Sequence, residues 1–290
     1  MDHASAIDTM NDLRDTMLRQ LFGLAGEVAV VTGGLGRLGS EYVRTLAHAG
    51  AAVAVFDICH GSNPTLNQLM ADGYRIVVRQ LDITSRAQVR AAMQDVARAL
   101  GTPTILVNNA GLGSSPSAGD ADNGPFEDYP EHAWDSMLDS HLKGMFFVSQ
   151  AFLECFRASG EKRQGSIINV SSTYGLVSPD QAVYEFRRQP GRPYYKPVAY
   201  SVAKSGVLNF TRWLAEYCAP FGVRVNTLAP GGVREASHAP EFVEEYVRRT
   251  PLGRMASEHD YNAAVLFLAS GGSGYMTGSL LVVDGGWTAR

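Results

Sequence analysis

Short runs of apolar residues alternate along the chain with longer segments in which apolar residues recur every three or four positions. The short runs are rich in Val and Ile, which is typical of strands buried on both faces of a parallel sheet. They predict strands at residues 28–32, 52–57, 75–81, 104–108, 166–171, 224–229 and 280–284. The longer segments predict helices at residues 88–99, 132–157, 199–219 and 258–269. This alternation predicts an α/β fold, a doubly wound, Rossmann-type parallel seven-stranded sheet with helices on both faces.

Two parts of the chain lie outside this alternation. Residues 1–25 precede the first predicted strand, and their apolar residues from Leu13 onward recur at helical spacing. We expect a helical N-terminal extension whose apolar face packs on the body or on a neighbouring subunit. Residues 177–198 are rich in aromatic and basic residues and form an insertion between a predicted strand and the helix predicted after it. Because the chain is long enough for one large core, residues 26–290 are expected to form a single domain.

Composition and charge exclude several classes of protein. The chain is 45% hydrophobic and carries a formal charge of -4, which indicates neither disorder nor binding to nucleic acid or an anionic membrane. Its three cysteines are widely spaced, which predicts neither a disulfide framework nor a metal site. The N-terminus has no signal-peptide pattern, and no stretch of about 18 residues is apolar. We therefore expect a cytoplasmic protein whose partner is a small molecule.

A glycine-rich turn follows the first predicted strand. Gly33, Gly36 and Gly39 stand between this strand and a helical stretch, with Arg37 inside the turn. Glycines allow the backbone to turn tightly and to approach a pyrophosphate, whose charge meets free N–H groups at the start of the helix. Asp57 ends the next strand, near the offset of about 20 residues expected for a carboxylate that binds adenosine ribose hydroxyls. The combination predicts a dinucleotide site.

The same residues bear on which dinucleotide binds. The carboxylate of Asp57 repels a 2′-phosphate, which favours NAD over NADP. Arg37 argues in the other direction, because a guanidinium in the turn could neutralise a phosphate, although it could equally point to solvent or to the pyrophosphate. We expect NAD as the cofactor, with NADP as the less favoured alternative.

Together with later motifs, these residues resemble the short-chain dehydrogenase/reductase family from about residue 26 to residue 287. The motifs are Asn108-Asn109-Ala110-Gly111, Ser172, Tyr200-Ser201-Val202-Ala203-Lys204, Pro230-Gly231 and Val283-Asp284-Gly285-Gly286. The resemblance implies a dinucleotide-binding catalytic domain, a homodimer or homotetramer, and contacts to adenine from Asp82 and Ile83. The expected cofactor-binding residues are Gly33, Gly36, Arg37, Leu38, Gly39, Asp57, Ile58, Asp82, Ile83, Asn109, Ala110, Gly111, Tyr200, Lys204, Pro230, Gly231 and Val233.

Tyr200, Lys204 and Ser172 suit the oxidation of an alcohol. That reaction needs a hydride acceptor on one side of the carbon and a base for the hydroxyl proton. A phenol with a pKa of about 10 is too weak a base at neutral pH unless a cation lies near it. Lys204 follows Tyr200 by four positions, which places both on one face of a helix. The hydroxyl of Ser172 would hydrogen-bond the substrate oxygen and stabilise charge there.

His141 marks the clearest departure from the family pattern and is included among the expected catalytic residues. It stands in His141-Leu142-Lys143-Gly144, where the family has an asparagine that helps to hold a water relaying protons to the lysine. A ring nitrogen of His141 could take over this role, the backbone alone could hold the water, or the histidine could be a packing residue. Two smaller departures are Arg37, where the family has a glycine, and the segment from Val233, where a threonine is frequent.

The insertion separates two of the expected catalytic residues. Ser172 and Tyr200 lie about twice as far apart as is usual in the resembling family, so residues 177–198 should emerge beside the site. The expected substrate-binding residues are Ser172, Tyr174, Arg187, Arg188 and Arg192. Arginine forks bind carboxylates and tyrosines bind hydroxyls, which favours an anionic, hydroxylated substrate. A charged surface loop or a subunit contact would explain the same composition.

These patterns predict an NAD(H)-dependent oxidoreductase that interconverts a secondary alcohol and a ketone on a polyol, sugar or sugar-acid substrate. One alternative is a 3-oxoacyl thioester reductase, although such enzymes generally use NADPH and Asp57 argues against that cofactor. The other is a catalytically idle protein that binds a dinucleotide as a redox sensor or scaffold, which the replacement at His141 would favour.

Overall fold

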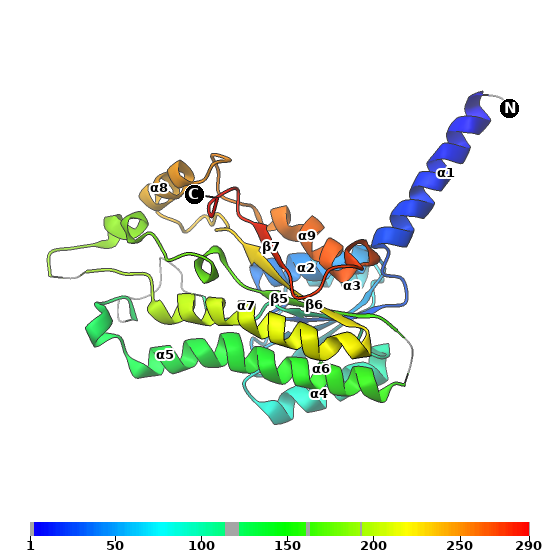
Figure 1. The fold of residues 1–290 in the computed structure, drawn as a ribbon, viewed down its shortest axis with the longest axis horizontal. Helices are drawn as coiled ribbons and strands as arrows, with labels where there is room; N and C mark the ends of the chain where they lie inside the picture. The colour runs from blue at the N-terminus through cyan, green and yellow to red at the C-terminus, as the bar shows by residue number, and fades with distance from the viewer. Residues whose placement is uncertain (1–2, 114–121, 161–162, 192, 290) are drawn as a thin grey trace.

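Seven parallel strands form one sheet in a computed structural model of the chain (Figure 1). The structure describes residues 3–113, 122–160, 163–191 and 193–289, with the backbone alone for residues 3–12. The strands are β1 (Val28–Thr32), β2 (Ala52–Asp57), β3 (Ile76–Gln80), β4 (Ile105–Asn108), β5 (Gly165–Val170), β6 (Val223–Pro230) and β7 (Leu280–Val283). Their order is β3-β2-β1-β4-β5-β6-β7, and Val30 lies opposite Ala54 and Leu106. The predicted doubly wound sheet is confirmed.

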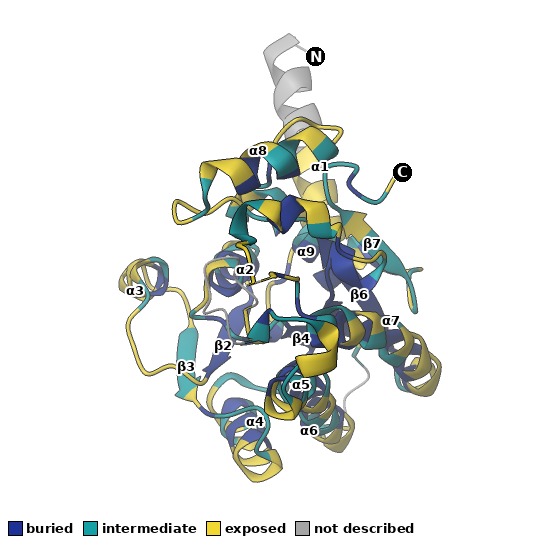
Figure 2. Cartoon of the chain, turned by 90° about the vertical axis from the view of Figure 1, so that its left-hand side faces the viewer, coloured by how far each residue is buried: buried dark blue, intermediate teal, exposed yellow. Residues whose placement is uncertain are grey.

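Helices cover both faces of this sheet. They are α1 (His3–Phe22), α2 (Arg37–His48), α3 (Pro64–Ala71), α4 (Arg86–Leu100), α5 (Glu131–Leu138), α6 (Gly144–Ala158), α7 (Val198–Cys218), α8 (Pro240–Arg249) and α9 (Asn262–Ala269). Helices α2, α3 and α9 pack on one face, and α4, α6 and α7 pack on the other. Figure 2 shows the buried strands between α2 and α9 on one side and α4 and α6 on the other.

Successive residues of the central strands point into opposite layers, as the pleat of a strand requires. Val30 and Ala54 belong to the core beneath α4, α6 and α7, whereas their neighbours Val31 and Val53 belong to the core beneath α2 and α9. All four side chains are fully buried. Burial on both sides explains why these strands have apolar runs without polar alternation.

The helices differ from their predicted extents more than the strands do. The apolar spacing does not predict α3 or α8. Helix α3 has only 8 residues, and half of the residues of α8 are charged. The helix expected over residues 132–157 is divided into α5 and α6 by a π-helical turn, Asp139–Lys143. A π-helical turn leaves helix on both sides, so the spacing of apolar residues does not reveal it.

Helix α1 projects away from the rest of the molecule (Figure 1). Leu13 is 66% exposed and Met17 is 58% exposed, so these apolar side chains do not pack on the body as expected. Contact with the body occurs at the end of the helix, where a Cβ atom on Gly272 would lie 2.8 Å from the ring of Phe22. Among the described residues, no helix is both long and apolar enough to cross a membrane.

The order of the strands creates a crevice at the centre of the sheet. Strands β1 and β4 are neighbours, and the chain moves outward from them in opposite directions, to β2 and to β5. At such a switch point the loops after the carboxyl ends of the strands diverge and leave room for a ligand. The glycine turn, Asn109, Ser172 and Gly231 follow four of these strand ends.

Candidate active site

The glycine turn between β1 and α2 is so closely packed that it excludes larger side chains. Gly33 has φ of +63° and donates its N–H to the carbonyl of Phe56 at 2.7 Å. A Cβ atom on Gly39 would overlap the carbonyl oxygen of Gly33, and one on Gly34 would lie 2.7 Å from Val55 Cγ1. The replacement of the usual glycine by Arg37 therefore leaves the tightest positions of the turn unchanged.

Asn109 connects the end of β4 to this turn. Its side-chain Nδ2 donates to the carbonyl oxygens of Thr32 and Gly33, at 3.1 and 3.2 Å. Its backbone N–H donates to Thr32 Oγ1 at 3.0 Å, and so does that of Ala110. These bonds hold the two sides of the crevice at a fixed separation.

The carboxylate of Asp57 is held by backbone groups on both sides. It accepts hydrogen bonds from the N–H of Leu35 and the N–H of Cys59, both at 2.9 Å. The side chain is buried and lines a cavity of about 550 Å³ beside the glycine turn. Asp57 therefore fixes the shape of the turn and presents a carboxylate to the cavity.

Arg37 also lines this cavity but is engaged by carboxylates. Its guanidinium pairs with Glu258 at 2.8 Å and lies 3.9 Å from a carboxylate oxygen of Glu235. A 2′-phosphate would have to compete with these two acidic side chains for the guanidinium.

The 550 Å³ cavity collects most of the residues expected to bind the cofactor. Those that line it are Gly33, Gly36, Arg37, Leu38, Gly39, Asp57, Ile58, Asp82, Ile83, Asn109, Ala110 and Gly111. Backbone N–H groups at the start of α2 lie at one side and the fixed carboxylate of Asp57 lies at another. This arrangement fits the adenosine and pyrophosphate of a dinucleotide.

A second cavity of about 340 Å³ adjoins the first and shares Leu38, Asn109 and Gly111 with it. The remaining expected residues that line it are His141, Ser172, Tyr174, Tyr200, Lys204, Pro230, Gly231 and Val233. The fold thus brings the expected catalytic residues together at the end of the predicted dinucleotide site.

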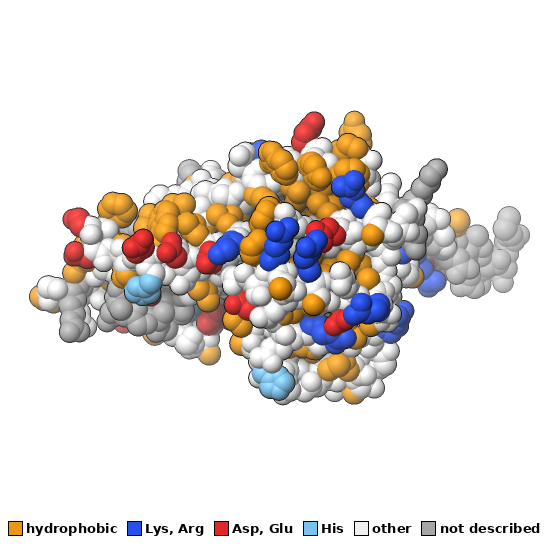
Figure 3. All heavy atoms as spheres, turned by 90° about the horizontal axis from the view of Figure 1, so that it is seen from below, with side chains coloured by type: hydrophobic (Ala, Val, Ile, Leu, Met, Phe, Trp, Pro, Cys, Tyr) orange, Lys and Arg blue, Asp and Glu red, His pale blue; other side chains and the backbone are white. Residues whose placement is uncertain are grey.

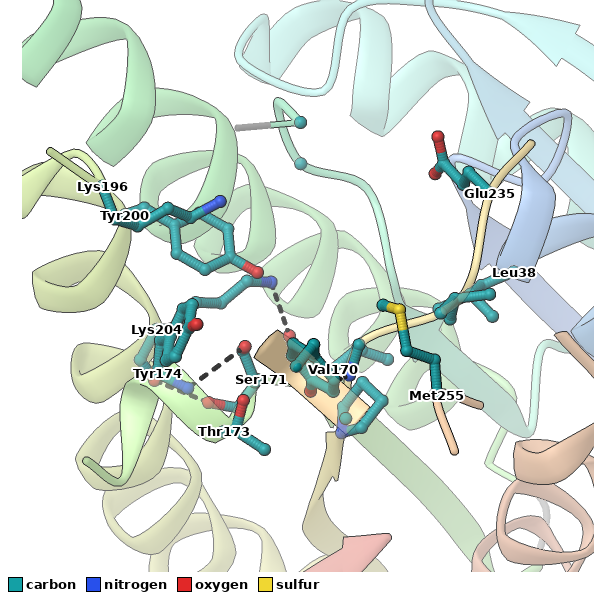
Figure 4. A pocket seen from close by; sticks show the side chains of 18 of the residues that line it. Leu38, Val170, Ser171, Thr173, Tyr174, Lys196, Tyr200, Lys204, Glu235 and Met255 are labelled. Carbon is teal, nitrogen blue, oxygen red and sulfur yellow. Dashed lines mark hydrogen bonds between the residues drawn. The ribbon is translucent and has the colours of Figure 1, made fainter. Parts of the chain in front are cut away.

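Tyr200 and Lys204 lie on α7, facing the end of β5 (Figure 4). Lys204 is buried, and its Nζ donates to the carbonyl of Val170 at 3.0 Å and lies 5.9 Å from the centre of the Tyr200 ring. Ser172 lines the same cavity as Tyr200, and its Oγ accepts from the N–H of Tyr174 at 3.2 Å. A phenol, a serine hydroxyl and an ammonium group thus converge on one cavity.

Burial sets the ionisation of these groups. It raises the pKa of Tyr200, and the hydrogen bond from Ser172 opposes that rise. Burial also lowers the pKa of Lys204 to about 8, so its ammonium form still predominates at neutral pH. The ammonium favours the phenolate form of the neighbouring tyrosine, which is the form that can accept a proton from an alcohol.

His141 lies in the π-helical turn Asp139–Lys143, buried against Tyr200. Its ring meets that of Tyr200 edge-on, with 5.6 Å between the ring centres. A Cβ atom on Gly111 would overlap the imidazole, so glycine at that position makes room for the histidine. The family's asparagine position is thus filled by a larger ring that still faces the site.

The hydrogen bonding of His141 restricts what it can do. Nε2 lies 3.1 Å from the carbonyl oxygen of Leu112, which can only accept, so Nε2 carries the proton. Nδ1 is then an acceptor; it is buried and has no hydrogen-bond partner among the residues that the structure describes. Burial, and then the charge of Lys204, lower the pKa of His141 to about 3. At physiological pH this imidazole can hold a proton donor such as a water molecule, but it does not itself become protonated.

An aromatic wall closes the substrate side of the 340 Å³ cavity. It consists of Tyr174, Tyr184, Phe242 and Tyr246, and the hydroxyls of Tyr174 and Tyr184 lie 3.2 Å apart. Tyr246 stacks on Trp287 with 4.2 Å between ring centres. The wall therefore combines the segment after β5, the insertion and α8, and the C-terminal segment packs against it through Trp287.

The basic residues of the insertion are divided between the surface and the cavity. Arg187 lies over the ring of Tyr194 at 4.7 Å, and Arg188 pairs with Glu185. Neither arginine lines the cavity, and Arg192 lies outside the described residues. Lys196 does line the cavity, which places the insertion beside the site as expected but through a different basic residue.

Sequence reasoning did not select several residues that line the substrate side, among them Lys196, Glu235, His238 and Tyr246. A signal for Lys196 is present, because it precedes Tyr200 by the same four positions by which Lys204 follows it. The others come from segments after β6 whose spacing carries no such signal. Within the described part of the chain, no group of three or more His, Cys, Asp and Glu side chains could hold a metal ion.

Comparison with known proteins agrees with this geometry. A family model described as "Enoyl-(Acyl carrier protein) reductase" matches residues 36–288. The chain is 35% identical over 277 residues to galactitol 2-dehydrogenase of Rhizobium johnstonii, covering 93% of this chain and 98% of the relative. The chain belongs to the short-chain dehydrogenase/reductase family. The resemblance found in the sequence motifs is confirmed.

Solved structures of this family superpose on the whole fold. A short-chain dehydrogenase from Leptospira borgpetersenii with bound NAD+ is 31% identical, with a TM-score of 0.78 and coverage of 93% of this chain and 95% of that one. A gluconate 5-dehydrogenase from Burkholderia cenocepacia, in complex with NADP and tartrate, is 28% identical, with a TM-score of 0.80 and coverage of 94% and 99%. This short-chain dehydrogenase/reductase is accordingly an oxidoreductase that acts on CH–OH groups with a nicotinamide dinucleotide.

Proposed function

We propose that the protein interconverts a secondary alcohol and a ketone with NAD(H), on a polyol, sugar or sugar-acid substrate. The proposal rests on the convergence of Tyr200, Lys204 and Ser172 in a cavity continuous with the dinucleotide cavity. In the oxidative direction the substrate hydroxyl gives its proton to Tyr200 Oη, while Ser172 hydrogen-bonds the substrate oxygen. A bound nicotinamide would supply the acceptor for the hydride that leaves the carbon bearing this hydroxyl.

The state of Tyr200 differs between the two directions of the reaction. In the reductive direction, burial keeps the phenol protonated, and it donates its proton to the oxygen formed from the ketone. In the oxidative direction, Lys204 favours the phenolate. His141 Nδ1 is suited to hold a water next to this lysine, which would carry the proton onward in place of the usual asparagine.

The preference for NAD is supported by the carboxylate and the arginine of the first cavity. Asp57 is fixed by two backbone N–H groups in an orientation that suits ribose hydroxyls and repels a phosphate. Arg37, which could reverse the preference, is paired with Glu258. Structures similar to this chain contain either NAD+ or NADP, so the proposed preference for NAD rests on Asp57 and Arg37.

The substrate class is supported by the relatives and by the second cavity. The relatives described above act on galactitol and on gluconate by their names. The cavity of about 340 Å³ has to accept the nicotinamide as well as the substrate, which favours a small molecule. Tyrosine rings and hydroxyls in its wall suit a hydroxylated carbon skeleton.

An acyl-thioester reductase is a second candidate, because the matching family model bears the description of an enoyl-acyl carrier protein reductase. The two candidates differ in cofactor and in substrate. A 3-oxoacyl thioester reduced with NADPH, with no turnover of polyols or sugar acids, would favour the second.

We also propose that the protein forms a homodimer or homotetramer through α6 and α7. A groove of about 840 Å³ runs between these helices and is lined by Phe146, Leu153, Trp213 and Tyr217 among others. Trp213 is 64% exposed and stacks on Tyr217. Figure 3, seen from below, shows hydrophobic side chains gathered beside basic ones on this side of the molecule. A second copy of the chain would bury this aromatic surface.

Light scattering tests the assembly, since Trp213→Glu should lower the molar mass to that of a monomer if this face is the interface.

We also propose a cytoplasmic location, because all three cysteines are unpaired, as they would be in a reducing compartment.

The function is tested by NADH and NADPH formation over a panel of polyols, aldonic acids and secondary alcohols. We expect turnover of at least one hydroxylated substrate, with a higher kcat/KM for NAD than for NADP. Tyr200→Phe serves as the control for catalysis by the described site. Failure to oxidise or reduce any member of the panel, with NADH binding intact, would favour the dinucleotide sensor.

A further inference from the structure

Lys196 places a second ammonium group beside the catalytic tyrosine. It precedes Tyr200 by four positions in the sequence, whereas Lys204 follows Tyr200 by four. Its Nζ lies 5.1 Å from the centre of the Tyr200 ring and 5.8 Å from that of Tyr184. Both tyrosines line the cavity, and Figure 4 shows the lysine side chain lying along Tyr200. Tyr200 therefore lies between Lys204, which faces β5, and Lys196, which comes from the insertion.

The backbone of Lys196 is fixed before α7 begins. Its N–H donates to Oε1 of Gln181 at 2.8 Å, and the N–H of Tyr195 donates to the carbonyl of Asn123 at 2.8 Å. The following residue, Pro197, is buried and precedes the first turn of the helix. These contacts hold the lysine at the boundary between the insertion and the catalytic helix.

The surroundings of Lys196 favour a negatively charged ligand. Aromatic rings flank its side chain, and burial lowers its pKa to about 7. The carboxylate of Glu235 lines the same cavity and lies 3.9 Å from the guanidinium of Arg37. Desolvated ammonium groups are stabilised by a carboxylate that binds next to them.

We propose that Lys196 binds the carboxylate of an acidic substrate and so makes the enzyme selective for hydroxy acids over uncharged alcohols. The proposal deepens the proposed function, on which it rests. Because the lysine lies so near the ring whose hydroxyl takes up the proton, the carboxylate and the oxidised carbon must be separated by only a few bonds. A hydroxy acid oxidised close to its carboxylate meets this requirement, whereas a long acid oxidised at its far end does not.

A second role for the same lysine would be to stabilise the Tyr200 phenolate, and the two roles have different kinetic signatures. Loss of a carboxylate anchor raises KM for acids alone. Loss of a cation that acts on Tyr200 lowers kcat for every substrate and shifts the pH–rate profile. The comparison of charged and uncharged substrates therefore separates them.

The experiment measures kcat and KM for aldonic acids and tartrate, and for the primary amide of each, with NAD. Lys196→Gln should raise KM for the acids about 10- to 100-fold, with kcat and the amide KM values little changed. Lys196→Arg should restore most of the acid affinity. Lys143→Gln is the matched control, since this exposed lysine pairs with Asp139 and should leave the KM values unchanged.

Calorimetric binding of tartrate to the enzyme with NADH gives a readout that does not depend on turnover, and thermal unfolding checks that Lys196→Gln folds. Equal effects on acids and amides, a fall in kcat alone, or no effect would each overturn the anchor. Wild-type oxidation of neutral alcohols but not acids would overturn the anchor and leave the oxidoreductase intact. No oxidation of any substrate would overturn both.

Discussion

The two cavities of the active site are built in different ways. The dinucleotide cavity consists of short turns that directly follow β1, β2, β3 and β4, and around Gly33 and Gly39 the backbone is packed so closely that it leaves no room for a Cβ atom. The substrate cavity takes its wall from the insertion and α8, through side chains such as Tyr184 and Tyr246, and Trp287 of the C-terminal segment stacks on Tyr246. The first is specified by local geometry, and the second by packing between distant segments.

This difference separates what a family shares from what one member does. A cavity made of backbone and glycine can hold a common ligand such as a dinucleotide in many sequences. A cavity made of side chains on an insertion can change its ligand through a few substitutions. Residues at the junction, namely Tyr200, Lys204 and His141, should then matter for every substrate, whereas Lys196 should matter for one class.

The largest effect is expected at this junction. Tyr200→Phe removes the acid–base hydroxyl and leaves the ring, so kcat should fall by about 10²- to 10⁴-fold while NADH binding persists. Steady-state kinetics and a fluorescence titration with NADH measure the two properties. Turnover within threefold of the wild type would contradict the role of this tyrosine.

His141 should show a smaller but clear effect. His141→Leu removes the Nδ1 acceptor and the bond to the Leu112 carbonyl, so kcat should fall by about 10²-fold, whereas His141→Asn should retain most activity. The pH–rate profiles of both variants provide the test. If the leucine variant keeps the wild-type profile and rate, His141 is a packing residue.

In the dinucleotide cavity, Asp57 should determine the affinity for NAD relative to NADP. Asp57→Ala should raise KM for NAD by about tenfold or more and narrow the gap to NADP, because a charged acceptor for the ribose hydroxyls is lost. The variant also loses the bonds to Leu35 and Cys59, so Asp57→Asn and thermal unfolding control for a loosened turn. A native preference for NADP would mean that Arg37 dominates.

The pH dependence of KM should distinguish charged from uncharged substrates. Burial lowers the pKa of Lys196 to about 7, so its ammonium form is present below that pH and is lost as the pH rises through it. KM for an acidic substrate should therefore rise severalfold between about pH 6 and pH 8, whereas KM for its amide should stay level. Tyr184, Tyr200 and His238 face the lysine, but burial raises the pKa of both tyrosines, so a parallel rise in KM for both substrates would assign the titration to a group other than Lys196.

The smallest effect is expected for the arginines on the outer side of the insertion. Arg187→Ala and Arg188→Ala should each change KM for an acid less than about twofold, because their guanidinium groups contact Tyr194, Tyr195 and Glu185. Parallel kinetics with the Lys196 variants measure the contrast. A tenfold rise in KM for an acid in either variant would mean that the arginines bind the carboxylate. KM for the same acid in Arg192→Ala tests the third arginine of the insertion.

The sequence by itself determined the sheet, the glycine turn and the pairing of Tyr200 with Lys204 on one helix, because each depends on residues close together in the chain. Strand periodicity, a glycine turn before a helix, and the spacing of Tyr200 and Lys204 are local patterns with one structural outcome. The residues expected to bind the cofactor, several of them assigned through the family resemblance, line the two adjoining cavities.

Only the tertiary structure decided which basic residue of the insertion reaches the substrate cavity. Lys196 and Arg187 are both charged residues of one irregular segment, and their surroundings depend on how that segment packs against α7 and α8. The neutral state of His141 likewise follows from burial and from the charge of Lys204, a residue distant in sequence. Charge, burial and direction at such positions arise from contacts between remote segments, which residue spacing does not encode.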